Sequence, residues 1–185
     1  MLRRTVIALV AAFLCSAVAM PSLAEAAGKI GVANPMRLSS QSEPGKEAEK
    51  QLSTMFGKER QQLEKQGADL NKQAEDLRKQ AAALSEKARN ERAQKIQKQA
   101  QELDTKGTAY TQRLSRVQQA INSQLNEVLR AACESFAKKN GYDMIVDGTV
   151  VMFYTKANDV TDELIEEVNK LWKSKGGKFK LDAVK

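Results

Sequence analysis

The side chains that most often carry out chemistry are scarce in this 185-residue sequence. It has no histidine, which removes the usual general base and the commonest transition-metal ligand. A glycine-rich phosphate loop and a paired-cysteine metal motif are also absent from the sequence. Carboxylates such as Glu102 and Asp104 stand among charged residues, where solvation explains them without catalysis. The sequence therefore predicts a protein that is not an enzyme and uses no metal or cofactor.

Its two cysteines point the same way. Cys15 lies in an apolar segment near the start, so a processed chain would keep only Cys133. An exported protein with one thiol has no internal disulfide. Cys133 lies in an alanine-rich helical run, and we expect it to pack as a small apolar residue.

Basic residues give the clearest binding signal. The formal net charge is +7, and residues 78–98 hold seven basic side chains against only Glu86 and Glu91. Such a cluster favours an anionic membrane or an acidic protein as partner, whereas a solvated helix surface is the alternative. The seven residues are Arg78, Lys79, Lys87, Arg89, Arg92, Lys95 and Lys98.

Residues 1–26 are typical of a secretory signal peptide. Arg3 and Arg4 precede an apolar run, and small residues follow it. Cleavage after Ala24 and cleavage after Ala26 both fit the small-x-small rule, and an uncleaved membrane anchor is the alternative. We therefore expect the mature chain to be exported.

A long helical segment must position the basic cluster. Residues 46–140 contain no proline and consist mostly of Gln, Glu, Lys, Ala, Leu and Arg, which all favour helices. Apolar residues recur every seven positions in two series, which favours a coiled coil over a disordered linker. The series are Leu63, Leu70, Leu77 and Leu84, followed by Ile96, Leu103, Tyr110 and Val117.

The seven-residue step fails between the two series, so we expect the helix to fold back on itself. Folding near Asn90 sets Leu84 level with Ile96 and Leu63 level with Val117. We therefore predict an antiparallel hairpin arm over residues 46–129 with its tip near 89–92. A straight helix that dimerises in parallel is the alternative.

The ends of the arm join segments that predict a small β body. Residues 30–33 favour a strand, and 142–147 with 150–154 favour a β-hairpin. A helix is expected from Thr161, and the body is thus split between 27–45 and 130–175. The predicted fold is α+β and mostly helical, with three strands and a basic flexible tail at 176–185.

Such a body has too little surface to bury by itself, and three short strands leave open edges. Pairing those edges between subunits would solve both problems. We therefore expect a homo-oligomer with its arms protruding from a shared β core. The residues expected to form this core are Ile30, Val32, Ile145, Val146, Val151 and Phe153.

Several short motifs resemble those of the Skp/OmpH family of periplasmic chaperones. They are KIGVAN at 29–34, YDMIVD at 142–147 and VTDEL at 160–164, in the same order around a heptad hairpin. The chain departs from the family at Pro44-Gly45 and in the basic tail. The resemblance implies a trimer in which short strands build a central β-barrel and three arms enclose a cavity.

The resemblance also implies a function. It suggests a periplasmic holdase that keeps unfolded outer-membrane proteins soluble without ATP, with lipopolysaccharide or an anionic membrane surface as a further partner. A structural coiled-coil spacer or envelope adaptor is the alternative. Nucleic acid is not expected as a partner, because aromatic residues do not stand among the basic ones as stacking platforms would.

Overall fold

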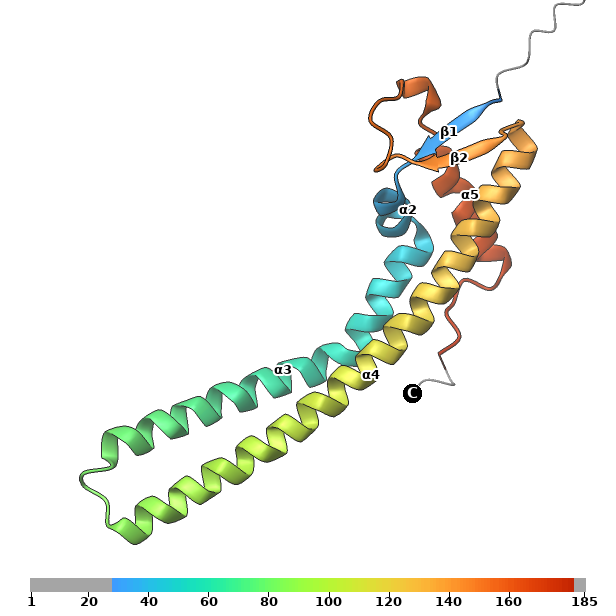
Figure 1. Cartoon of the computed structure of the whole chain (residues 1–185). Coiled ribbons are helices and arrows are strands. Elements are labelled where there is room, and N and C mark those ends of the chain that lie inside the picture. Colours follow the sequence, from blue (N-terminus) through green and yellow to red (C-terminus); the bar gives the residue numbers. More distant parts are fainter. Residues whose placement is uncertain (1–27, 182–185) are drawn as a thin grey trace, which may run out of the picture.

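The computed structural model describes residues 28–181, which form a small body and a long two-helix arm (Figure 1). The arm is inserted between the two strands of the body, which explains why the body is split in sequence. The predicted signal peptide lies outside the described residues. The elements in chain order are β1 (Ile30–Ala33), α2 (Pro35–Gln41), α3 (Glu43–Gln80), α4 (Glu86–Asn140), β2 (Met144–Asp147), the 3-10 turn η1 (Lys156–Asn158) and α5 (Thr161–Ser174).

The helical hairpin forms as predicted, but the tip predicted near 89–92 is wrong. The chain turns at 81–85, and α4 already begins at Glu86. Ser85 Oγ accepts a hydrogen bond from the amide of Ala88 (3.3 Å), so a serine N-cap starts the second helix. The three alanines before it favour a helix and hide the turn in the sequence.

The register of the arm differs from the predicted one by one heptad. Arg92 Nη1 donates to Gln80 Oε1 (2.8 Å) near the tip, and the rings of Phe56 and Tyr110 lie 5.8 Å apart lower down. Every seven-residue slip still sets large residues level with large ones, so the sequence pattern alone did not select between registers. The observed register brings Leu77 beside Ile96 and Leu70 beside Leu103, and it places Gly67 next to the side chain of Leu103.

The main core lies at the base of the arm, where α5 packs against α4. Val117 and Ile121 of α4 are each only 1% exposed, and Phe56 of α3 joins them. Val168 and Trp172 complete this core from α5. A second, smaller core under the sheet contains Ala33, Leu38, Phe136, Val160 and Leu164.

The sheet of the described chain has two parallel strands rather than the predicted three. β1 pairs with β2, so that Val32 lies opposite Val146. On its other side β1 is bridged by Asp159, and the amide of Val160 donates to the carbonyl of Val32 (2.9 Å). Only the outer edge of β2 is therefore left open in the part of the sheet that the structure describes.

The predicted β-hairpin between 142–147 and 150–154 is wrong, because the second segment forms no strand in the described chain. The amide of Gly148 donates to the carbonyl of Ala33 (2.8 Å), which carries the chain onward beside β1. Gly148 also lacks the positive φ that a type I′ hairpin turn needs. The apolar run that suggested a strand is left in solvent, with Met152 104% and Phe153 82% exposed.

Two predicted boundaries also change. Helix α3 begins at Glu43 and includes Pro44 in its first turn. Proline fits there because amides of the first turn have no acceptor within the helix, so its lack of an N–H breaks no hydrogen bond. Gly45 is required there: a Cβ at this position would lie 1.5 Å from the carbonyl oxygen of Ser39. The tail predicted to be flexible from 176 is packed against the protein as far as Leu181, which is 5% exposed.

Candidate functional site

The structure brings the seven predicted basic residues together at the end of the arm. All seven are exposed, on the last turn of α3 and along the first turns of α4, on both sides of the turn at 81–85. Lys79 pairs with Glu75 (2.6 Å) and Arg92 with Gln80, while the cluster as a whole keeps its positive excess. The remaining members are Arg78, Lys87, Arg89, Lys95 and Lys98.

The predicted seam residues lie on the facing helices α3 and α4, except Leu84, which lies in the turn at 81–85, and most of them are only half-buried. Val117, at the base, is the one that is fully enclosed. Two open cavities of about 270 and 380 Å³ follow one side of the seam and share Gln73 in their linings. Leu70 and Leu77 reach these cavities, so the outer arm combines accessible apolar surface with a polar rim.

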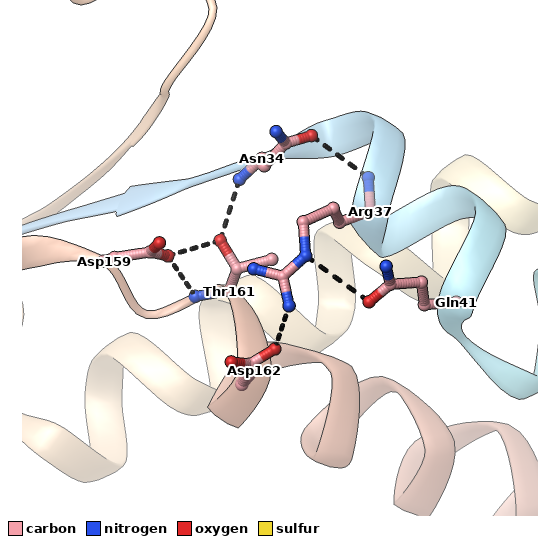
Figure 2. Close-up of polar contacts among 6 residues, drawn as sticks. All are labelled: Asn34, Arg37, Gln41, Asp159, Thr161 and Asp162. Carbon is pink, nitrogen blue, oxygen red and sulfur yellow. Dashed lines mark hydrogen bonds and ion pairs between the residues drawn. The ribbon is translucent and has the colours of Figure 1, made fainter. Parts of the chain in front are cut away.

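A polar network fixes the root of the arm to α5, as Figure 2 shows. Thr161 Oγ1 donates to Asp159 Oδ1 (2.5 Å) and accepts the amide hydrogen of Asn34 (3.0 Å). The amide of Thr161 also donates to Asp159 Oδ1 (3.0 Å). The hydrogen bond from the Thr161 hydroxyl lowers the pKa of Asp159 below its ordinary value, and the bond from the Thr161 amide lowers it further.

Arg37 extends this network from α2. Its guanidinium forms an ion pair with Asp162 at the start of α5 and its Nε donates to Gln41 Oε1 (3.4 Å). Asn34 Oδ1 accepts the amide hydrogen of Arg37 (3.1 Å) and so caps α2. The end of β1, the first helix and the start of α5 are thus held in one arrangement, from which α3 leaves for the arm.

A separate polar contact, centred on Glu167, joins α4 to α5. Glu167 accepts hydrogen bonds from Lys139 Nζ (2.5 Å) and from Ser135 Oγ (2.7 Å). The bond from Lys139 is the main reason that the pKa of Glu167 is lowered. This contact orients the two helices whose apolar faces form the main core.

The remaining chemically notable residue is Cys133, which is a free, half-buried thiol. Burial raises its pKa, so less of the nucleophilic thiolate is present at neutral pH. Its neighbours belong to the smaller core, in accord with the packing role expected from the sequence. Among residues 28–181, no group of three or more His, Cys, Asp or Glu is placed to hold a metal ion.

The six residues expected to join subunits do not behave alike. Val32 is 3% exposed and fills the core of its own chain, so it cannot be offered to a partner. Ile145, Val146 and Val151 are half-buried. The exposed large apolar residues lie on the sheet, on α2 and in the segment that follows β2, and they are Ile30, Met36, Met144, Val150, Met152 and Phe153.

Sequence reasoning missed two features of this region. It did not find the network around Asp159, because Asn34 and Arg37 contact Thr161 and Asp162 across 127 and 125 positions of the chain. It also missed the packing of Phe179 and Leu181, although their alternation with lysines was a visible signal. Within the described residues, no helix has the length and apolar character needed to cross a membrane.

Comparison with known proteins decides the family. A family model described as "Outer membrane protein (OmpH-like)" matches residues 29–168, from β1 to the middle of α5. The chain belongs to the OmpH-like family. The motifs at 29–34, 142–147 and 160–164, which suggested this family, all lie within the matched range.

Curated OmpH-like relatives include the chaperone protein Skp of Yersinia enterocolitica, which is 26% identical over 77% of this chain and 87% of its own length. Skp of Pectobacterium atrosepticum is 25% identical, covering 78% of this chain and 87% of the relative. A crystal structure of an OmpH-like protein from Caulobacter crescentus CB15 superimposes with a TM-score of 0.60. At 19% identity over 78% of this chain and 86% of the other, it shows the same fold.

Proposed function

We propose that this OmpH-like protein is an ATP-independent holdase of the periplasm that surrounds unfolded outer-membrane proteins with its helical arms. The family match over the arm and both halves of the body is the observation that carries the proposal. The relatives named Skp are chaperones, and the basic, apolar start of the sequence supports export with removal of residues 1–26.

The outer arm is suited to holding a chain loosely. Its seam residues are half-buried, and its two cavities are open and rimmed by side chains such as Gln66 and Gln73. A long surface of this kind offers many weak contacts, and no deep apolar pocket lies along it in the described residues. Weak, distributed contacts prevent aggregation and still allow release without nucleotide.

A cavity requires several arms, so the proposal includes a homotrimer joined through the bodies. Two observations support assembly: the open outer edge of β2, and the exposed apolar side chains of Ile30, Met144 and Phe153. An exposed strand edge beside exposed apolar residues is typical of a surface that is covered in an oligomer. A shared β-barrel would place the arms around a common axis.

The basic tip is the proposed contact for acidic partners. Its seven exposed lysine and arginine side chains lie at the end of the arm, far from the body (Figure 1). We propose that it attracts acidic segments of clients, and lipopolysaccharide or an anionic membrane surface as well. Attraction of this kind weakens with salt, because exposed charges are screened.

A direct test dilutes a urea-denatured outer-membrane β-barrel protein into buffer that contains the mature chain but no nucleotide. Light scattering should stay low, and native mass measurement should find a complex with three copies of the chain. A barrel that precipitates as fast as it does alone would contradict the proposal. A stable complex with a folded envelope protein instead would favour the adaptor function.

The contribution of the tip is tested by charge reversal at Arg89, Arg92, Lys95 and Lys98. Capture of the denatured barrel should slow several-fold at low salt, and the difference from the parent chain should disappear at high salt. A matched control reverses two lysines and two arginines that are exposed elsewhere in the described chain: Lys46, Lys58, Arg116 and Arg130. Equal capture rates for the parent chain and the tip variant at low salt would remove the tip from the account.

A further inference from the structure

The last described residues continue from the end of α5 and lie along the base of the arm (Figure 1). Gly176 and Gly177 have φ values of +97° and +63°, which residues with a side chain rarely adopt. The amide of Gly177 donates to the carbonyl of Trp172 (3.0 Å), so the two glycines end α5. We call the segment after these glycines, residues 178–181, the strap.

The strap lies in a groove formed by all three long helices. Phe179 and Leu181 are 7% and 5% exposed, and they belong to the same apolar cluster as Phe56 of α3 and Val117 of α4. The ring of Phe179 lies 4.7 Å from that of Trp172 on α5. This groove is thus lined by α3, α4 and α5 and holds two apolar side chains.

Helix α4 also binds the backbone of the strap, in addition to the contacts with its side chains. The carboxamide of Gln124 on α4 accepts the amide hydrogen of Lys180 at Oε1 (2.9 Å) and donates from Nε2 to the carbonyl of Lys180 (3.0 Å). One glutamine therefore satisfies both backbone groups of one residue. Because every peptide unit offers the same pair of groups, this contact imposes no sequence requirement at the central position.

The strap also has the side-chain pattern of a β-strand. Phe179 and Leu181 are buried in the groove, whereas the alternating residues Lys178 and Lys180 are exposed. Alternation with a period of two is how strands of outer-membrane barrels separate apolar from polar residues. Beside the strap a cavity of about 360 Å³, lined by Gln51, Thr54 and Met55, leaves room for further side chains.

We propose that the groove between α3, α4 and α5 is a docking site for extended client segments with alternating apolar residues, and that the strap is its built-in, displaceable occupant. This inference rests on the proposed holdase function and names a subsite for it. The family match ends at residue 168, so it does not include the strap. Docking of a client segment at the base would release the strap and anchor the client beneath the outer arm.

Displacement is feasible because the strap is held by few contacts. Two buried side chains and the Gln124 hydrogen bonds stabilise the docked strap. They must offset the conformational entropy that is lost when the six residues 176–181, two of which are glycines, become ordered. The short tether still gives the strap a high effective concentration at its groove. A short free peptide is therefore excluded, whereas a long client that also contacts the outer arm can compete.

The test uses a fluorescent peptide with the sequence of residues 177–185 and a control peptide with serine in place of phenylalanine and leucine. The mature chain truncated after Gly177 should bind the first peptide about tenfold or more tightly than the full mature chain does. The control peptide should bind neither. The double variant Phe179→Ser with Leu181→Ser, which keeps the full length, should bind the peptide as the truncated chain does.

Circular dichroism confirms that each variant is folded before binding is measured. Equal peptide affinity for the full and the folded truncated chain, or no binding to either, would overturn the proposal. A second measurement needs no variant, because the amide of Lys180 is hydrogen-bonded to Gln124 while the strap is docked. Saturating the full chain with an unfolded barrel should speed amide exchange in residues 178–181.

The two proposals fail in different ways. If the barrel stays soluble while amide exchange in residues 178–181 does not change, the strap proposal is wrong and the holdase function stands. If the barrel precipitates in the presence of the parent chain, the holdase function itself is wrong.

Discussion

The base of the arm and the outer arm are built from the same two helices but are held together differently. We define the base as residues 117–136 of α4 with the parts of α3 and α5 that pack on it, and the outer arm as residues 63–110. At the base Ile121 is 1% exposed and is covered from three helices. In the outer arm Leu70 and Ile96 are half-buried, since only two helices meet there. Stability is therefore concentrated at the base, and the outer arm can deform.

Ion pairs follow the same division. Three pairs near the base bind α5 and its C-cap residue to α3 and α4: Lys139 with Glu167, Lys173 with Glu43 and Lys175 with Glu127. In the outer arm the described ion pairs lie within one helix, as between Lys79 and Glu75. The pair Arg113 with Glu59, at 2.5 Å, crosses from α4 to α3 just below the outer arm. Ion pairs between helices thus become fewer toward the tip.

The largest expected effect comes from truncating a base residue. Ile121→Ala should lower the free energy of unfolding by about 2–5 kcal/mol, because it leaves a cavity in a three-helix core. Leu70→Ala, the matched change in the outer arm, should cost about 1 kcal/mol or less, because solvent and neighbouring helices can fill the space. Urea denaturation followed by circular dichroism measures both. Equal losses would show that the two regions do not differ as described.

The register of the outer arm can be tested by a cross-link. In a Cys133→Ser background, cysteines at Leu77 and Ile96 should form a disulfide on mild oxidation, since these residues are level in the seam. Closing a loop of this length adds about 3 kcal/mol to the stability of the enclosed hairpin. The control pair Leu77 with Leu103 follows the register expected from the sequence and should stay reduced. The opposite outcome would restore a tip near residue 90.

The network at the root of the arm should have a smaller, pH-dependent effect. Thr161→Val removes a donor to the Asp159 carboxylate and should cost about 1–3 kcal/mol at neutral pH. Because the pKa of Asp159 is lowered in the folded protein, its stabilising effect is present above the ordinary carboxyl pKa and is lost as pH falls through the lowered value.

The variant Asp159→Asn isolates that titration. Its stability, measured by urea denaturation from pH 2 to 7, should depend less on pH in the acid range than that of the parent chain. Parallel curves for the two proteins would show that Asp159 does not couple protonation to folding.

The smallest effect is expected at the ion pair below the outer arm. Arg113→Ala should change global stability by about 1 kcal/mol or less, because both partners are partly exposed to solvent. Amide exchange in residues 63–110 should nevertheless increase, since the pair is the last ion pair between the two helices on the way to the tip. Unchanged exchange in the outer arm would mean that the seam alone determines its flexibility.

The sequence predicted most of the helical architecture because heptads and caps are local signals. The strand at 30–33 and the helix that begins at Thr161 are found as expected. The tip was placed wrongly because Ala81 to Ala83 favour a helix and because heptad patterns match again after each seven-residue slip. The cap at Ser85 was the local signal that distinguishes the two registers.

The β body was predicted less well, for a different reason. Residues 150–154 have the composition of a buried strand, but the hydrogen bond from Gly148 to Ala33 carries the chain onward beside β1 instead of back along the open edge of β2. The basic tip, in contrast, could be listed residue by residue, because charge is read directly from the sequence. What these residues bind depends on partners, which no pattern within one chain identifies.

A firm base carries a deformable outer arm, which we propose binds clients. Amide hydrogen exchange of the mature protein, alone and saturated with an unfolded outer-membrane barrel, tests it most directly. We predict that amides of residues 63–110 exchange faster than those of 117–136 in the free protein, and that the client slows exchange in the outer arm while the α4 amides of the base remain slow. Protection confined to the body, or an outer arm that exchanges as slowly as the base in the free protein, would contradict the account.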